Sequence, residues 1–276
     1  MALTSVNGIT IGYDDHTPAG GGIGDPVVLV HGHPFDRSMW DPQVADLTAA
    51  GYRVITFDLR GYGESGVVPG TTPLSDFAGD AAALLDHLGV ARAVFGGLSM
   101  GGQIVMEIHR LFPDRVAALL LADTFAQAET DEGKRARNAM ADRLLAEGMD
   151  GYAHEVLDKM VAPYNVTELT DVADHVLRMM RNTPPEGAAA ALRGRAERPD
   201  YADSLKLAAV PALVVVGADD AFTPVSDAEY LDTLLPEATL AVVQGAAHMP
   251  NLERPAEFNT VLRDFLAALY EGGARP

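Results

Sequence analysis

Residues 95–103 read FGGLSMGGQ, with four glycines around a single serine. The stretch contains the pattern G-x-S-x-G, which describes a sharp turn from a strand into a helix with Ser99 at its apex. Small residues beside the apex avoid collisions, and the strained backbone lifts the serine hydroxyl out of the sheet. The stretch lacks the lysine of a phosphate-binding loop. It therefore predicts a nucleophilic serine at the end of a buried strand.

Short apolar runs alternate with helix-like segments on both sides of this turn. Continuous apolar runs are typical of strands that are covered on both faces. Their alternation with helices predicts an α/β fold, with a mostly parallel central sheet and helices on both faces. The runs are VVLV (27–30), VITF (54–57), AVF (93–95), AALLLA (117–122), ALVVV (212–216) and TLAVV (239–243).

The alternation stops between residues 125 and 205. This segment is helix-like and polar, contains five of the ten methionines, and shows no convincing strand. Methionine suits the wall of an adaptable apolar pocket, although ordinary helix packing uses it as well. We interpret the segment as a helical cap, or lid, that Pro184 and Pro185 divide into two parts. The core domain is then predicted to comprise residues 1–124 and 206–276.

A second glycine-rich pattern, GYGESG at residues 61–66, also follows a predicted strand. It matches G-x-G-x-x-G, but a dinucleotide site requires a helix to open at the third glycine. The residues that follow, VVPGTTP, cannot start a helix. We therefore expect a structured loop here and no nucleotide cofactor.

A serine hydroxyl needs a base, and His248 is the best placed of the eight histidines. It follows the predicted strand 239–243 and a turn of small residues. Ligands of parallel sheets gather beyond the carboxyl ends of the strands, where Ser99 is also expected. An acid must then orient the other imidazole nitrogen. Asp219 and Asp220 follow strand 212–216 and Asp123 follows strand 117–122, so spacing alone does not choose the acid.

Two backbone N–H groups are candidates for holding an oxyanion. Met100 follows the serine at the start of a helix, where the helix dipole favours negative charge. His33 lies in the loop after strand 27–30, whereas the next residue, Pro34, has no N–H to donate. His31 is interpreted as a structural residue.

The composition of the 276 residues narrows the possible functions. A formal net charge of −19 opposes binding to nucleic acid or to anionic membranes. The absence of cysteine excludes disulfides, thiolate catalysis and cysteine-bound metals. The first residues show no signal-peptide pattern, and no stretch has the length of a membrane span. We expect a cytoplasmic enzyme that acts on a small molecule without cofactor or metal. The sequence does not define its oligomeric state.

These motifs together resemble those of the α/β-hydrolase superfamily. The resemblance covers nearly the whole chain, with residues 125–205 similar only as a variable cap. The family pattern G-x-x-D-x-x-T-P implies that Asp220 is the acid, with Asp123 as a minority alternative, and supports His33 and Met100 as oxyanion donors. The matching motifs are HGHP (31–34), DLRGYGESG (58–66), GLSMGG (97–102), VVGADDAFTP (215–224) and GAAHMPNLERP (245–255).

Within this superfamily the sequence is most similar to carboxylesterases, 3-oxoadipate enol-lactonases and cofactor-free haloperoxidases. The resemblance implies a serine hydrolase that cleaves a carboxylic ester or lactone through an acyl-enzyme. Peracid formation and carbon–carbon bond hydrolysis need the same triad and are alternatives, as is a non-enzymatic small-molecule receptor. No pattern among the arginines of the expected cap singles out a binding group for an acidic lactone; these are Arg135, Arg137, Arg178, Arg181, Arg193 and Arg195.

Overall fold

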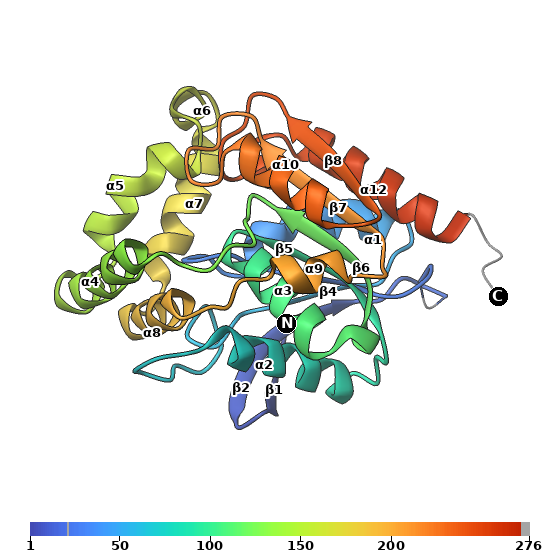
Figure 1. The fold of residues 1–276 in the computed structure, drawn as a ribbon, viewed down its shortest axis with the longest axis horizontal. Coiled ribbons are helices and arrows are strands. Elements are labelled where there is room, and N and C mark those ends of the chain that lie inside the picture. Colours follow the sequence, from blue (N-terminus) through green and yellow to red (C-terminus); the bar gives the residue numbers. More distant parts are fainter. Residues whose placement is uncertain (21, 272–276) are drawn as a thin grey trace.

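Within residues 1–20 and 22–271, which this computed structural model describes, eight strands form a single sheet (Figure 1). Its order is β1-β2-β4-β3-β5-β6-β7-β8; the pairs β1–β2 and β2–β4 are antiparallel and the other pairs are parallel. The predicted α/β fold with a mostly parallel sheet is therefore confirmed. The strands are β1 (Ala2–Val6), β2 (Ile9–His16), β3 (Val27–Val30), β4 (Val54–Phe57), β5 (Ala93–Leu98), β6 (Val116–Ala122), β7 (Ala212–Gly217) and β8 (Ala238–Val243).

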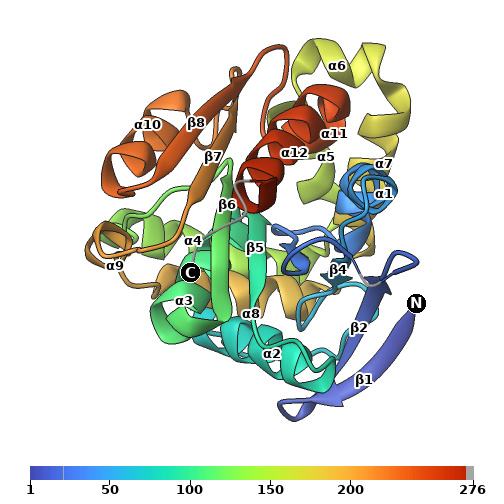
Figure 2. The ribbon, with the colours of Figure 1, turned by 90° about the vertical axis from the view of Figure 1, so that its right-hand side faces the viewer.

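The sheet divides the apolar core into two layers. In β3, Val28 and Val30 join the cluster that includes α2, α3 and α10, while Val27 and Leu29 join the cluster that includes α1 and α12. Successive side chains of a strand point to opposite faces, so a continuous apolar run serves both layers. Figure 2 shows the two sets of helices on opposite sides of the sheet. These helices are α1 (Asp41–Ala49), α2 (Leu74–His87), α3 (Met100–Leu111), α10 (Val225–Leu234) and α12 (Pro255–Glu271).

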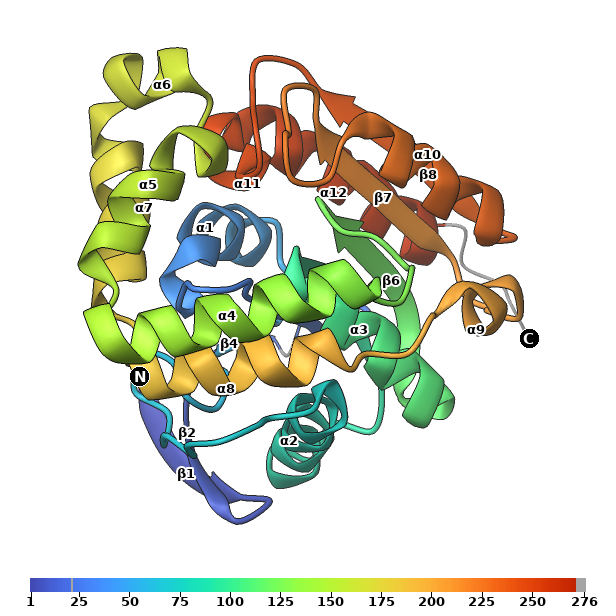
Figure 3. The same cartoon turned by 60° about the vertical axis from the view of Figure 1, so that its left-hand side comes forward.

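The segment between β6 and β7 is helical throughout its regular structure. Five of its helices, α4 to α8 or residues 131–196, are called the inserted helices below. Figure 3 shows α4 and α8 side by side in front of the sheet, and Leu144 of α4 packs with Ala188 and Leu192 of α8. The segment contains α4 (Asp131–Glu147), α5 (Asp150–Met160), α6 (Pro163–Glu168), α7 (Thr170–Asn182), α8 (Pro185–Ala196) and α9 (Ala202–Lys206).

Helix α8 contacts the core backbone to backbone at two glycines. A Cβ at Gly187 would lie 2.0 Å from the carbonyl oxygen of Gly61, in the loop after β4. A Cβ at Gly194 would lie 1.6 Å from the carbonyl oxygen of Thr72, whose N–H donates to Ala190 of the same helix. Only glycine allows so close an approach, so these two positions set how deeply α8 lies against the core.

Three short helical turns complete the described chain: η1 (Arg37–Trp40), η2 (Pro113–Arg115) and α11 (Pro250–Glu253). No helix in the described ranges is both long and apolar enough to cross a membrane.

Candidate active site

Ser99 occupies a strained turn between β5 and α3. Its backbone has φ 57° and ψ −117°, a conformation that residues with a side chain rarely adopt. A Cβ at Gly97 would lie 2.3 Å from the carbonyl carbon of Gly101, and one at Gly101 would lie 2.2 Å from the carbonyl oxygen of Val30. Gly97 and Gly101 must therefore be glycines, because neighbouring backbone atoms leave no room for a side chain at either position. The serine N–H donates to Ala122 at 2.9 Å, which ties the turn to β6.

His248 and Asp220 are in direct contact at the carboxyl ends of β8 and β7. The Nδ1 atom of His248 lies 2.7 Å from Oδ2 of Asp220, and both residues are buried. Oδ1 of Asp220 accepts from the N–H groups of Phe222 at 2.8 Å and Thr223 at 3.1 Å. Burial opposes ionisation, but the contact with His248 and the hydrogen bonds from Thr223 keep the pKa of Asp220 below its ordinary value. An ionised Asp220 holds the proton on Nδ1 and leaves Nε2 free to accept another.

Among the described residues, neither of the other two candidate acids forms a hydrogen bond with the imidazole. Asp219 is exposed and accepts a hydrogen bond from the hydroxyl of Tyr164 at 2.5 Å. Asp123 is buried at the end of β6, where its Oδ1 accepts from the N–H of Gly217 at 2.9 Å. Burial and the charge of Asp220 raise the pKa of Asp123 well above its ordinary value. Asp123 therefore holds its proton more tightly than an ordinary aspartate, and its hydrogen bond to Gly217 places it beside the His248–Asp220 pair rather than in it.

A buried glutamate holds the loop that carries His248. Glu253 of α11 accepts from the N–H of Ala247 at 2.8 Å through Oε1. Its Oε2 accepts from the N–H of Ala162 at 2.8 Å and from the side chain of Asn165 at 2.7 Å. One carboxylate therefore joins the residue before His248 to the inserted helices.

The loop after β3 lies directly against the serine. A Cβ at Gly32 would be 3.3 Å from Cβ of Ser99. The backbone of the next residue, His33, therefore also lies close to the nucleophile. Met100 begins α3, where the first N–H groups have no acceptor inside the helix. The Nδ1 atom of His33 lies 2.8 Å from the hydroxyl of Tyr62, and its Nε2 is buried without a hydrogen-bond partner among the described residues. Burial and the charges of nearby arginines hold the pKa of His33 well below its ordinary value, so the ring is neutral.

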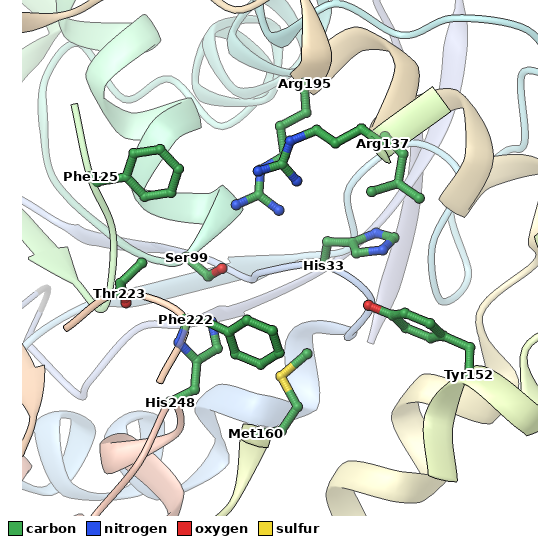
Figure 4. A pocket seen from close by; sticks show the side chains of 11 residues that line it. His33, Ser99, Phe125, Arg137, Tyr152, Met160, Arg195, Phe222, Thr223 and His248 are labelled. Carbon is green, nitrogen blue, oxygen red and sulfur yellow. The ribbon is translucent and has the colours of Figure 1, made fainter. Parts of the chain in front are cut away.

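Ser99, His248 and His33 line one cavity of about 140 Å³ (Figure 4). Ser99 and His248 lie on its core side, with Phe222 and Thr223 from the loop after β7. The inserted helices supply the opposite wall, and two of their side chains are arginines. The lining residues are His33, Ser99, Phe125, Arg137, Tyr152, Met160, Leu192, Arg195, Phe222, Thr223 and His248.

Comparison with known proteins identifies the family. A family model described as "alpha/beta hydrolase fold" matches residues 25–255. The chain belongs to the α/β-hydrolase family.

Several relatives of this α/β hydrolase match over most of its length. The structure of an esterase from Thermogutta terrifontis, determined with malate bound, has a TM-score of 0.91 and 37% identity, and the match covers 97% of each chain. The enol-lactonase from Burkholderia xenovorans LB400 has a TM-score of 0.87 and 30% identity over 96% of this chain and 100% of that one. The 3-oxoadipate enol-lactonase 1 of Acinetobacter baylyi is 29% identical over 85% of each chain.

Sequence reasoning left some cavity residues of this α/β hydrolase without a role. From the sequence, only the backbone of His33 received a role, whereas the hydrogen bond between its side chain and Tyr62 gives the ring a fixed orientation. Arg137 and Arg195 reach the cavity from α4 and α8, but the sequence did not distinguish them from other arginines of the segment. Tyr152 had no signal at all. Their helical positions fit a cavity-facing and a solvent-facing role equally well.

Proposed function

We propose that this α/β hydrolase cleaves carboxylic esters or lactones of small molecules through a covalent acyl-enzyme. Ser99 is the nucleophile, His248 the general base and Asp220 the acid that orients it. The observation that carries the proposal is the buried contact of 2.7 Å between His248 and Asp220, at the cavity that Ser99 also lines. The similarity to an esterase and to enol-lactonases supports ester or lactone hydrolysis as the reaction.

In the first step, Oγ of Ser99 attacks the carbonyl carbon while Nε2 of His248 takes its proton. The negative charge that develops on the carbonyl oxygen is stabilised by the N–H groups of His33 and Met100. The bond from carbon to the alcohol oxygen then breaks. The alcohol takes the proton from His248 and leaves an ester between Ser99 and the acyl group.

In the second step, His248 removes a proton from water, which attacks the acyl-enzyme. The same two N–H groups hold the oxyanion, the bond to Ser99 breaks, and the serine recovers its proton from His248. With an ester the products are an alcohol and an acid. With a lactone the alcohol stays attached to the acyl chain, so a single hydroxy or keto acid is released.

The inserted helices act as a cap in this proposal. They supply Arg137, Tyr152, Met160, Leu192 and Arg195 to the cavity wall, so they determine which substrates reach the nucleophile. The core of residues 1–124 and 206–276 carries the reacting groups. The reaction as written needs neither metal nor organic cofactor.

Active-site labelling with a fluorophosphonate, together with hydrolysis of p-nitrophenyl butyrate, tests the proposal. Ser99→Ala should abolish both while the circular dichroism spectrum is unchanged. The control Ser204→Ala, in α9, should retain both. Labelling and turnover that persist in Ser99→Ala would refute the nucleophile. Tight ligand binding without labelling of the wild-type protein would instead favour a receptor.

A further inference from the structure

Arg195 is a buried cation without a counter-ion. Only 8% of its surface is exposed, yet among the described residues no carboxylate lies within ion-pair distance of it. Within the part of the chain that the structure describes, its side chain makes a single hydrogen bond, from Nε to the side-chain oxygen of Gln103 at 2.7 Å. An ionised group taken out of water without a partner is strongly unfavourable, and an arginine does not escape by losing its proton. The guanidinium group of Arg195 therefore lacks the negative partner that would stabilise its charge.

The surroundings of Arg195 add positive charge. Arg137 and Arg198 both pair with the same acid, Glu129, at the edge of the cavity. Glu129 therefore serves two guanidinium groups, and the third, that of Arg195, is left without an ion-pair partner among the described residues. Burial, followed by the charges of Arg137 and Arg198, lowers the pKa of Arg195 well below its ordinary value. This local excess of positive charge contrasts with the net charge of −19 of the whole chain.

The unpaired charge is directed at the reaction centre. Figure 4 shows the guanidinium groups of Arg195 and Arg137 extending into the cavity toward Ser99. Gln103, which holds Nε of Arg195, lies one helical turn after Ser99 on α3. The helix that begins at the nucleophile therefore also fixes the arginine fork, which faces the cavity with its two terminal nitrogens. Such a fork matches the two oxygens of a carboxylate.

The rest of the cavity limits what can carry that carboxylate. Phe125, Met160, Leu192 and Phe222 make much of the wall apolar, and the volume is only about 140 Å³. A short chain therefore links the anionic group to the carbonyl at Ser99. We propose that Arg195, assisted by Arg137, binds a free carboxylate of the substrate, so that the enzyme acts on short esters or lactones that carry a second, ionised acid group. This inference rests on the hydrolase function proposed above.

The test compares two esters that differ only in charge: monomethyl succinate and its neutral amide analogue, methyl succinamate. Methanol release gives kcat and KM for each. The wild-type enzyme should prefer the charged ester by at least about tenfold in kcat/KM. Arg195→Met should lower kcat/KM for monomethyl succinate by about 50-fold, mainly through KM, and change it less than about threefold for methyl succinamate. Arg195→Lys should recover part of the preference.

Arg193→Met is the matched control on the same helix, because Arg193 is paired with Asp142 outside the cavity. It should leave the preference unchanged. The proposal is overturned if the wild-type enzyme does not prefer the charged ester, or if Arg195→Met slows both esters equally, which would indicate a purely structural arginine.

Binding to the Ser99→Ala variant separates this inference from the proposed function. Monomethyl succinate should raise the melting temperature of that variant more than methyl succinamate does, and the difference should disappear in Ser99→Ala/Arg195→Met. This result requires no turnover, so it stands even if Ser99 is not the nucleophile. Equal shifts with the two compounds would refute the carboxylate site while leaving ester hydrolysis intact.

Discussion

Asp220→Asn should inactivate the enzyme through the wrong imidazole tautomer. Oδ1 of Asp220 accepts from the N–H groups of Phe222 and Thr223, so the asparagine carbonyl must occupy that position. The new NH2 group then faces Nδ1 of His248, 2.7 Å away in the wild-type protein. Nδ1 must accept this hydrogen bond, and the ring proton moves to Nε2. A protonated Nε2 cannot take the proton of Ser99.

The expected loss follows from the chemistry of triads. Holding the imidazole in the wrong tautomer lowers kcat by about 10⁴-fold in a serine hydrolase of this type. That factor corresponds to about 5 kcal/mol of lost transition-state stabilisation, at roughly 1.4 kcal/mol for each power of ten. The assay is kcat for p-nitrophenyl butyrate, with circular dichroism as a check on folding. The rate of fluorophosphonate labelling should fall in parallel, since labelling uses the same activated serine.

Two matched amide substitutions complete this experiment. Asp219→Asn changes the exposed residue that precedes Asp220. It should leave kcat within about twofold, because Asp219 is hydrogen-bonded to Tyr164 and not to His248. Asp123→Asn keeps a side-chain oxygen for the N–H of Gly217 and leaves the His248–Asp220 hydrogen bond in place, so it should leave kcat within about tenfold. Asp220→Asn with more than a tenth of wild-type activity would refute the reasoning. So would a larger loss in Asp123→Asn.

Three further predictions concern stability and association. Burial raises the pKa of Asp123 well above its unfolded value, so the contribution of this one group to stability should fall as pH rises, by up to roughly 1.4 kcal/mol per unit. Buried histidines with lowered pKa, such as His33, act in the opposite sense in both proteins, so the test is a difference: between about pH 5 and 7.5, urea denaturation should show Asp123→Asn gaining stability relative to the wild type. Glu253→Gln disturbs three buried hydrogen bonds and should lower the free energy of unfolding by about 2 kcal/mol; a change below about 0.5 kcal/mol would contradict the role given to Glu253. Added salt from 20 to about 200 mM should raise kcat/KM for monomethyl succinate, because it screens the net charge of −19 from an anionic substrate. A fall in kcat/KM would mean that the arginines dominate even at long range.

The parallel strands were predictable because they are buried on both faces. The runs at 27–30 and 54–57 coincide with β3 and β4 residue for residue, and the other four runs fall within β5 to β8. None of the six runs marks β1 or β2. Strand β1 lies at the edge of the sheet and has alternating burial, with Leu3 exposed, so it lacks the continuous apolar signal.

The candidate site was predictable where local backbone geometry determines it. The turn at Ser99 needs glycines that the sequence displays, and the position of His248 follows from where a strand ends. The acid was not decided by spacing, because Asp123 and Asp220 both follow parallel strands and differ only in which side chain reaches the imidazole. The orientation of Arg195 was beyond sequence reasoning, since it depends on the contact of α8 with the core.

The close contact between α8 and the core means that the range of substrates depends on how near two backbone segments lie to each other. Ordinary packing distances would require α8 to retreat by more than about 1 Å if either Gly187 or Gly194 acquired a side chain. Arg195 adjoins Gly194, so the retreat would withdraw the guanidinium from the cavity without changing any residue that meets substrate. During evolution, drift at two positions remote from the reaction could therefore turn an acid-selective enzyme into a generalist. In directed evolution, the same two glycines are where altered selectivity should first be sought.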